Sequence, residues 1–283
     1  MKAPIGEQDV RHFRKHGWVR VPGLHDREQV ALLLATMEKG LANPPDVSRT
    51  YGAANPATPR DVVSNKDPKV ILLNVRELNL YYDEVKPVCL DPKVGEVVRA
   101  LLGAERVRLF SETYLDKPAG GLPTPWHQDW PLQPFDRRDT VNCWVALDDI
   151  DMEQGPLQVV SGSHRLGSLY MPTDFSEQPP LGQMLSAEDR DLLWSLADPS
   201  DVDDGGAPVH RAPFAAGDAL IFYGSALHGA PANRTGRRRR GYTRAIISAD
   251  VRYTGMPYLK TDAVGLQPGQ AFDLPRYPMF AAG

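Results

Sequence analysis

The 283-residue sequence has only two cysteines, nearly balanced charge and no long hydrophobic run. Cys89 and Cys143 cannot form a disulfide framework and neither lies in a CxxC pair, so we expect two buried free thiols in a reducing compartment. The chain carries 32 Lys and Arg against 36 Asp and Glu, a formal charge of −4. This balance gives no overall attraction to nucleic acid or to anionic membranes.

No apolar stretch approaches the ~18 residues that a membrane span needs. The N-terminal residues 1–18 also lack the apolar core of a signal peptide. A hydrophobic content of 42% is enough for a large core, which argues against disorder. The sequence therefore predicts a soluble, cytoplasmic protein, a monomer or small homo-oligomer, whose partner is a small molecule and neither nucleic acid nor membrane.

The first third of the sequence predicts mainly helices. Residues 7–16 form an amphipathic pattern that ends at Gly17, and a short strand follows as far as the Pro22-Gly23 turn. Asp26 is a candidate cap for a second helix, and residues 91–102 again have helical periodicity. Between them, residues 43–69 are rich in Pro, Asn, Asp and Ser, which is typical of a functional loop.

From about residue 105 the pattern changes to short strands rich in β-branched and aromatic residues, separated by Gly, Pro and Asp turns. One helix, with Ser186 as its cap, interrupts them at residues 186–197. This order predicts a β-sandwich core that carries N-terminal helices. We expect a single domain over residues 1–283: a helical part to about 104, the core over about 105–250 and a tail over 251–283.

The segment TPWHQDW contains the most informative of the seven histidines. It places His127 and Asp129 two residues apart in an extended stretch, where side chains at i and i+2 point to the same face. The other histidines have ordinary interpretations: His12 and His16 belong to a charged helix face, and His25 to a turn. An imidazole and a carboxylate side by side are a candidate pair of metal ligands.

His228 follows His127 by 101 residues and comes directly after an apolar strand. Two imidazoles and one carboxylate match the facial triad that holds non-haem Fe(II) and leaves three coordination positions open. A structural zinc site would instead use four protein ligands, commonly including cysteine. We therefore predict that His127, Asp129 and His228 bind iron and serve as the catalytic centre.

Six arginines lie within the 16 residues after His228: Arg234, the run 237–240 and Arg244. A 2-oxo acid that chelates the iron has a distal carboxylate, and arginine can bind it through two parallel hydrogen bonds. We expect most of the run to form a solvated hairpin tip. At least one of these arginines is expected to turn inward.

Three segments resemble one family: PWHQDW, NCWVALDDIDMEQGPLQVVSGSHRLG and GDALIFYGSALHGAPANRTGRRRRGY. In order and spacing, the chain from about residue 8 to 250 resembles the phytanoyl-CoA dioxygenase-like Fe(II)/2-oxoglutarate oxygenases. The resemblance implies a mainly β fold with flanking α-helices, with a double-stranded β-helix (jelly-roll, cupin-like) core. It also implies an oxidoreductase whose cofactors are Fe(II), the co-substrate 2-oxoglutarate, and O₂.

Carried over residue by residue, the family's iron ligands fall on His127, Asp129 and His228. The arginine that binds the 2-oxoglutarate tail falls on Arg239, with Arg240 and Arg244 as rivals. Trp144 resembles the family's tryptophan that lines the co-substrate pocket.

One position departs from the family pattern. Where many members have a hydroxyl residue two positions after the distal histidine, this chain has Ala230. Thr243, or less directly Thr113, is the candidate to supply the missing hydrogen bond to the co-substrate.

The resemblance implies a dioxygenase that hydroxylates, or otherwise oxidises, an unactivated C–H bond of a small molecule such as a secondary-metabolite or amino-acid-like intermediate. One alternative is an acyl-CoA hydroxylase, whose CoA phosphates Arg137, Arg138 and the 237–240 run would bind. Another is a non-catalytic jelly-roll protein that binds a metal or a carboxylate. Residues 43–69 and the tail 252–283 are the candidate lids.

Overall fold

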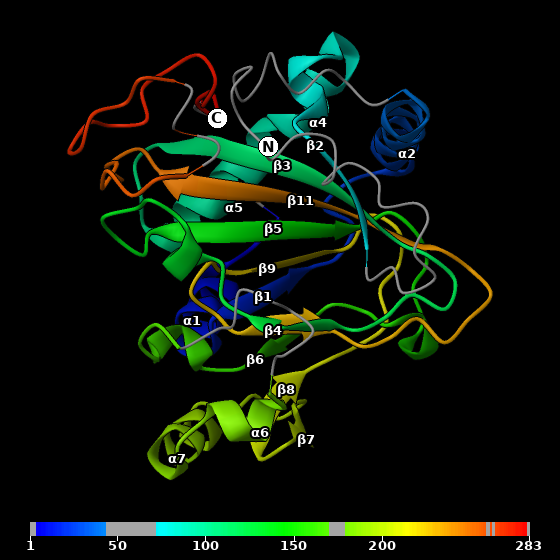
Figure 1. Ribbon diagram of the computed structural model, residues 1–283, viewed down its shortest axis with the longest axis vertical. Helices are drawn as coiled ribbons and strands as arrows, with labels where there is room; N and C mark the ends of the chain where they lie inside the picture. Colours follow the sequence, from blue (N-terminus) through cyan, green and yellow to red (C-terminus); the bar gives the residue numbers. More distant parts are fainter. Residues whose placement is uncertain (1–3, 44–71, 170–178, 259–260, 262–263, 282–283) are drawn as a thin grey trace.

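The computed structural model describes residues 4–43, 72–169, 179–258, 261 and 264–281. Two antiparallel sheets face each other (Figure 1). The larger sheet has the strand order β1 (Trp18–Val21), β9 (Ala219–Tyr223), β5 (Thr140–Ala146), β11 (Arg239–Ser248), β3 (Val107–Lys117), β2 (Leu73–Arg76). The smaller has the order β4 (Thr124–His127), β10 (His228–Ala230), β6 (Gln158–Val160), β8 (Ala207–His210), β7 (Val202–Asp204). The predicted mainly β jelly roll with flanking helices is confirmed.

Both faces of the larger sheet are buried, and the side chains along each strand point alternately into two hydrophobic cores. On β5, Cys143 and Val145 pack toward the helices, whereas Trp144 and Ala146 pack into the space between the sheets. On β9, Ile221 and Phe222 divide in the same way. Because side chains alternate along a strand, each strand of this sheet serves a helix-facing core and an inter-sheet core at once.

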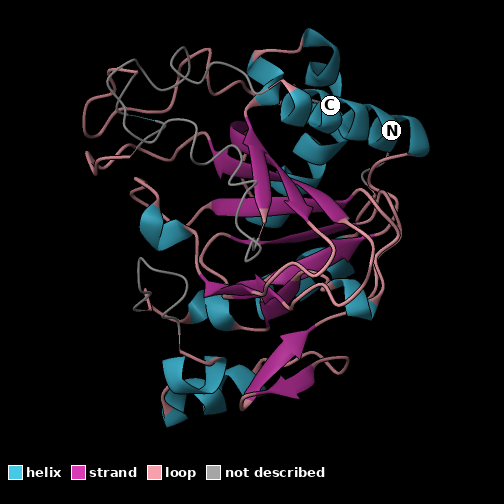
Figure 2. Ribbon diagram, turned by 45° about the vertical axis from the view of Figure 1, so that its right-hand side comes forward, coloured by secondary structure: helices cyan, strands magenta, loops and turns pink. Residues whose placement is uncertain are grey.

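Helices cover the outer face of the larger sheet (Figure 2). They begin and end where the sequence predicts, since Gly17 and Gly103 end two of them with φ of +88° and +66° and the Asp26 side chain caps a third. The helices of this layer are α1 (Glu7–His16), α2 (Arg27–Ala42), α4 (Lys86–Cys89) and α5 (Pro92–Leu102), with the 3₁₀ turns η2 (Leu78–Leu80) and η3 (Asp83–Val85).

A second helical group lies at the far end of the smaller sheet, beside β7 and β8 (Figure 1). It contains α6 (Leu181–Met184) and α7 (Ala187–Ser195), and the Ser186 side chain caps α7 as predicted. Short 3₁₀ turns also occur in the connections: η4 (Trp130–Leu132), η5 (Met152–Gln154) and η6 (Ser163–Arg165).

Two short strands have no counterpart in the sequence interpretation. Within the part expected to be mainly helical, to about residue 104, β2 pairs with β3 at the edge of the larger sheet. Asp203 and Asp204 lie in β7, which pairs with β8 across a Gly205-Gly206 turn. Both strands are only three or four residues long, which is too short for a hydrophobic pattern to identify them from the sequence.

The C-terminal tail packs against the body of the protein. Phe272 and Tyr277 contact Phe110 through ring stacking and edge-to-face contacts, and the Phe280 amide donates a hydrogen bond to the Val107 carbonyl. These contacts hold this part of the tail along the start of β3.

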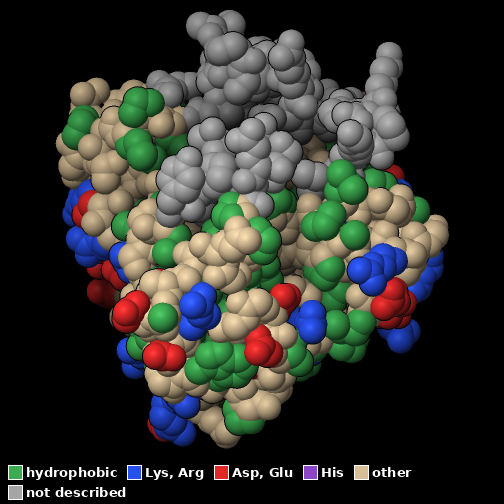
Figure 3. Space-filling view, turned by 60° about the horizontal axis from the view of Figure 1, so that its bottom comes forward, with side chains coloured by type: hydrophobic (Ala, Val, Ile, Leu, Met, Phe, Trp, Pro, Cys, Tyr) green, Lys and Arg blue, Asp and Glu red, His purple; other side chains and the backbone are tan. Residues whose placement is uncertain are grey.

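Cys89 and Cys143 are both free and buried, as predicted. No helix among the described residues combines the length and apolar character required to cross a membrane. Figure 3, in which the lower end of Figure 1 turns toward the viewer, shows Lys and Arg side chains interspersed with Asp and Glu. The nearly balanced charge of the sequence is therefore also mixed locally on this face.

Candidate active site

His127 and His228 lie directly opposite each other on the paired strands β4 and β10. Their ring centroids are 4.1 Å apart. Each Nδ1 lies beside a main-chain carbonyl two residues earlier: His127 at 2.8 Å from Pro125 O and His228 at 3.1 Å from Ala226 O. Because a carbonyl only accepts, Nδ1 carries the proton and each Nε2 presents its lone pair.

Asp129 completes the group, but not as the sequence predicts. The strand ends at His127, and Asp129 begins η4 with helical backbone angles (φ −84°, ψ −40°). The amides of Asp129 and Trp130 both donate to the Gly224 carbonyl, which draws the chain into this turn. The turn, rather than strand alternation, carries the carboxylate to the histidines. Its two oxygens each lie 3.7 Å from one of the imidazole Nε2 atoms.

Asn142 fixes the orientation of this carboxylate. Its side-chain Nδ2 donates to Asp129 Oδ2 at 2.5 Å. The sequence interpretation missed Asn142, although it lies two residues before Trp144 and therefore on the same inward face of β5.

The three donors suit a divalent metal ion. Burial, and then the neighbouring His127, lower the pKa of His228 to about 4 against the opposing effect of Asp129, so this imidazole is neutral at pH 7. The donor atoms of all three residues lie within 4.8 Å of one another. Two imidazoles and one carboxylate are the donor set typical of non-haem Fe(II).

Arg239 lies at the first residue of β11 with its side chain on the inward face, and it is only 2% exposed. Its guanidinium carbon is 5.9 Å from the Trp144 ring centroid, and its Nε has no hydrogen-bond partner among the described residues. Burial lowers its pKa to about 10, opposed by Asp116 and Asp148, so it stays protonated at neutral pH. A buried cation with an unpaired N–H is suited to binding a carboxylate.

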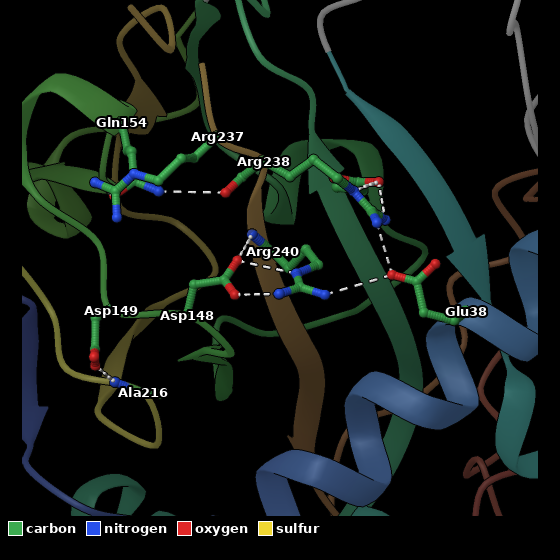
Figure 4. Close-up of polar contacts among 9 residues, drawn as sticks. Glu38, Asp148, Asp149, Gln154, Ala216, Arg237, Arg238 and Arg240 are labelled. Atoms are coloured by element: carbon green, nitrogen blue, oxygen red, sulfur yellow. Dashed lines mark hydrogen bonds and ion pairs between the residues drawn. The ribbon is translucent and has the colours of Figure 1, made fainter. Parts of the chain in front are cut away.

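The neighbouring arginines point elsewhere (Figure 4). Arg240 and Arg244 have the opposite parity to Arg239 and so lie on the helix-facing side of β11. Arg244 is fully buried there and donates to the Val88 carbonyl. The others pair with carboxylates: Arg237 with Asp151 (2.5 Å), Arg238 with Asp116 (2.6 Å) and Glu38 (2.8 Å), Arg240 with Asp148 (2.5 Å) and Glu38 (3.5 Å).

Asp148 and Asp149 serve different partners, as their adjacency implies. Asp148 accepts hydrogen bonds from Arg240, whereas Asp149 accepts one from the Ala216 amide on another loop (Figure 4). They do not form a catalytic carboxylate pair.

A cavity of about 440 Å³ between the sheets brings the predicted residues together. Thr243 is the register partner of both Thr113 and Trp144, so the three lie side by side across three strands. Predicted residues on its wall are His127, Asp129, His228, Arg239, Trp144, Thr243 and Thr113. Residues that were not predicted to be part of the site include Asn74, Arg76, Asn142, Leu157 and Phe222.

Glycine at position 241 makes room for the Trp144 indole. A Cβ atom there would lie 2.6 Å from Trp144 Nε1.

Of the two candidate lids, the first, residues 43–69, lies outside the described part of the chain except for Asn43.

Comparison with known proteins gives concordant matches. A family model described as phytanoyl-CoA dioxygenase (PhyH) matches residues 13–241. The probable alpha-ketoglutarate-dependent hypophosphite dioxygenase of Stutzerimonas stutzeri is 24% identical over 246 residues, 86% of this chain and 79% of that protein.

Two solved structures share the fold. The alpha-ketoglutarate-dependent carbocyclase SnoK from nogalamycin biosynthesis has a TM-score of 0.76 at 22% identity, covering 98% of this chain and 97% of its own. The epimerase SnoN, solved with Fe³⁺, alpha ketoglutarate and nogalamycin RO, has a TM-score of 0.72 at 24% identity, covering 97% and 98%.

Proposed function

The chain belongs to the phytanoyl-CoA dioxygenase family, and from this membership we propose that it is an Fe(II)- and 2-oxoglutarate-dependent oxygenase acting on a C–H bond of a small molecule. One observation carries the proposal: His127, Asp129 and His228 share one cavity with the buried guanidinium of Arg239, whose Nε has no hydrogen-bond partner among the described residues. This places a candidate Fe(II) site and a candidate site for the distal carboxylate of a 2-oxo acid in the same space.

In the proposed roles, the two histidine Nε2 atoms and the Asp129 carboxylate hold the ion. Arg239 binds the distal carboxylate of 2-oxoglutarate, and Trp144 forms the adjacent wall. Thr243 and Thr113 offer the hydroxyls that Ala230 lacks. When bound, Fe(II) with 2-oxoglutarate and O₂ supplies the oxidising chemistry, in which 2-oxoglutarate becomes succinate and CO₂. The protein contributes orientation of the reacting groups and an apolar enclosure.

A small substrate without a CoA group is favoured over an acyl-CoA. The arginines that would bind CoA phosphates are already paired: Arg237 with Asp151, and Arg238 with Asp116. The cavity volume of about 440 Å³ lies within the range of small-molecule sites. A secondary-metabolite or amino-acid-like compound is the proposed substrate class.

We also propose that the protein is cytoplasmic. The free thiols of Cys89 and Cys143 are consistent with a reducing compartment.

The test is succinate release from 2-oxoglutarate, measured against a metabolite panel with Fe(II) and air. We expect substrate-stimulated succinate formation in the wild type and none in Asp129→Ala, which removes a proposed iron ligand. Asp149→Ala, which removes an exposed carboxylate bonded to one backbone amide, is the matched control and keeps wild-type turnover. Full activity in Asp129→Ala overturns the ligand assignment. Fe(II) and 2-oxoglutarate binding without succinate release identifies a non-catalytic binding protein instead.

A further inference from the structure

A second group of metal-ligating side chains lies away from the cavity, between α1 and the loop after α7. His12 and His16 are one helical turn apart on α1, and Asp198 reaches them from that loop. The donor atoms of the three lie within 4.8 Å of one another. The sequence interpretation placed both histidines on a charged helix face, but His16 is buried and the His12 side chain is only 26% exposed.

The spacing of these donors is too wide for hydrogen bonds and close to that of ligands around one ion. Asp198 Oδ2 lies 3.6 Å from His12 Nδ1 and 4.0 Å from His16 Nε2. Two ligands bound at about 2.0–2.1 Å to one tetrahedral ion lie roughly 3.4 Å apart. A small inward movement of each side chain therefore produces a coordination site.

The hydrogen bonds made by His16 and Asp198 leave their donor atoms available for a metal ion. His16 Nδ1 donates to the Leu196 carbonyl at 2.8 Å, so its Nε2 keeps the lone pair. Asp198 Oδ1 accepts hydrogen bonds from the amide and hydroxyl of Ser200, and its Oδ2 faces the imidazoles. His12 Nε2 is buried without a hydrogen-bond partner among the described residues, so no hydrogen bond at this atom opposes metal binding through Nδ1.

The surroundings hold the donors in place. The His12 ring packs edge-to-face on Trp18 at 4.5 Å, and the Trp18 Nε1 donates to Ser161 Oγ at 2.7 Å. The Gly162 amide donates to the main-chain carbonyl of His16 at 2.7 Å. Burial, and then His16, lower the pKa of His12, against the opposing effect of Asp198.

We propose that His12, His16 and Asp198 form a second divalent-metal site of the Zn²⁺ class, with water completing the coordination. For nitrogen and oxygen donors the divalent series favours Zn²⁺ over Fe²⁺, so Zn²⁺ is the ion with which this second site is tested. Unlike a structural zinc site with four protein ligands, this site has three protein ligands and water. The ion would cross-link α1 to a loop that lies 182 residues further along the chain, counted from His16 to Asp198, and would stabilise the folded state by binding to it. The site shares no residue with the cavity, and the inference holds whether or not the proposed oxygenase activity does.

The test is Zn²⁺ titration of the metal-stripped full-length protein by calorimetry, with bound metal counted by elemental analysis. We expect two Zn²⁺ per chain for the wild type, because Zn²⁺ also enters the His127 site, and one for His12→Gln and Asp198→Asn. Asp129→Ala also binds one, but there Zn²⁺ still raises the melting temperature through the second site. Asp198→Asn loses at least a hundredfold in affinity for the second equivalent.

His210→Gln is the matched control, because His210 stacks on Trp18 at 3.7 Å but lies outside the donor group. It keeps both equivalents. Asp198→Asn preserves the shape of the side chain, and a wild-type circular dichroism spectrum excludes misfolding. Two tight equivalents in Asp198→Asn, or no Zn²⁺ bound by Asp129→Ala, overturn the proposal.

Discussion

Asn142 donates a hydrogen bond to Asp129 across the cavity, at 2.5 Å between Nδ2 and Oδ2. Asn142 belongs to the larger sheet, whereas His127 and His228 belong to the smaller one. The proposed iron ligands are thus oriented from both sheets, and this bond determines which way the carboxylate faces.

Replacing Asn142 by Leu removes this donor, and we expect Fe(II) affinity to fall by about 10–100-fold, as for other outer-shell partners of metal ligands. Competition with a chromogenic iron chelator under anaerobic conditions measures it. Cys143→Ala alters the next residue on β5, whose side chain faces the helices. It leaves Fe(II) affinity unchanged even where stability falls. Equal iron affinities for the two variants contradict the assigned role of Asn142.

Arg239→Gln is expected to weaken 2-oxoglutarate binding by about a hundredfold. The loss corresponds to two hydrogen bonds to a charged group at roughly 1.5 kcal/mol each. The anaerobic visible band of the iron-bound 2-oxo acid provides the titration signal. Arg240→Gln, on the opposite face of β11, stays within about twofold of wild type because its partner is Asp148. A larger effect at position 240 would reassign the co-substrate arginine.

Gly241→Ala places a methyl group 2.6 Å from Trp144 Nε1 and forces the indole to move. We expect a loss of about 1–3 kcal/mol in the free energy of unfolding, the usual cost of overpacking, together with weaker 2-oxoglutarate binding. Denaturant unfolding measures the first quantity. Gly236→Ala, where a Cβ meets nothing within 4 Å, is the neutral control. Wild-type behaviour of Gly241→Ala would show that the indole has room to shift.

Lys117 gives the co-substrate end of the cavity a pH dependence. It is the register partner of Arg239, its Nζ donates to the Leu122 and Pro231 carbonyls, and burial followed by Arg239 lowers its pKa to about 7. Below pH 7 the side chain is an ammonium that attracts the 2-oxoglutarate dianion, and above pH 7 it is neutral.

The affinity of the iron-loaded protein for 2-oxoglutarate is therefore expected to fall by roughly fivefold, about 1 kcal/mol, as pH rises from 6 to 8. Lys117→Met removes the titrating group and flattens this dependence. A slope in Lys117→Met as steep as in the wild type would place the titration elsewhere.

The sequence predicted those parts of the fold and candidate site that depend on local chemistry. Gly17 ends α1 and Ser186 caps α7 because a left-handed residue and a side-chain acceptor act within one turn of the helix. The spacing of His127 and His228 was readable because both belong to motifs of a known family.

The rest depends on contacts between distant segments. Asp129 lies beside His127 because the amides of Asp129 and Trp130 donate hydrogen bonds to the Gly224 carbonyl. The sequence around residue 129 contains no pattern that predicts these hydrogen bonds. In the same way, the sequence placed His16 on a charged helix face and did not show its burial, because Asp198, which lies beside it, comes 182 residues later.

The pairing of His127 with His228 has a consequence for the apoprotein. The hydrogen bonds between β4 and β10 that hold these residues opposite each other are those of the sheet itself. The entropy of bringing the two imidazoles together is therefore lost once, during folding, and not again when an ion arrives. We therefore expect iron to bind and dissociate at a preformed site. Removal of iron by a chelator leaves a folded protein that binds iron again, unlike domains that fold only when their metal is bound.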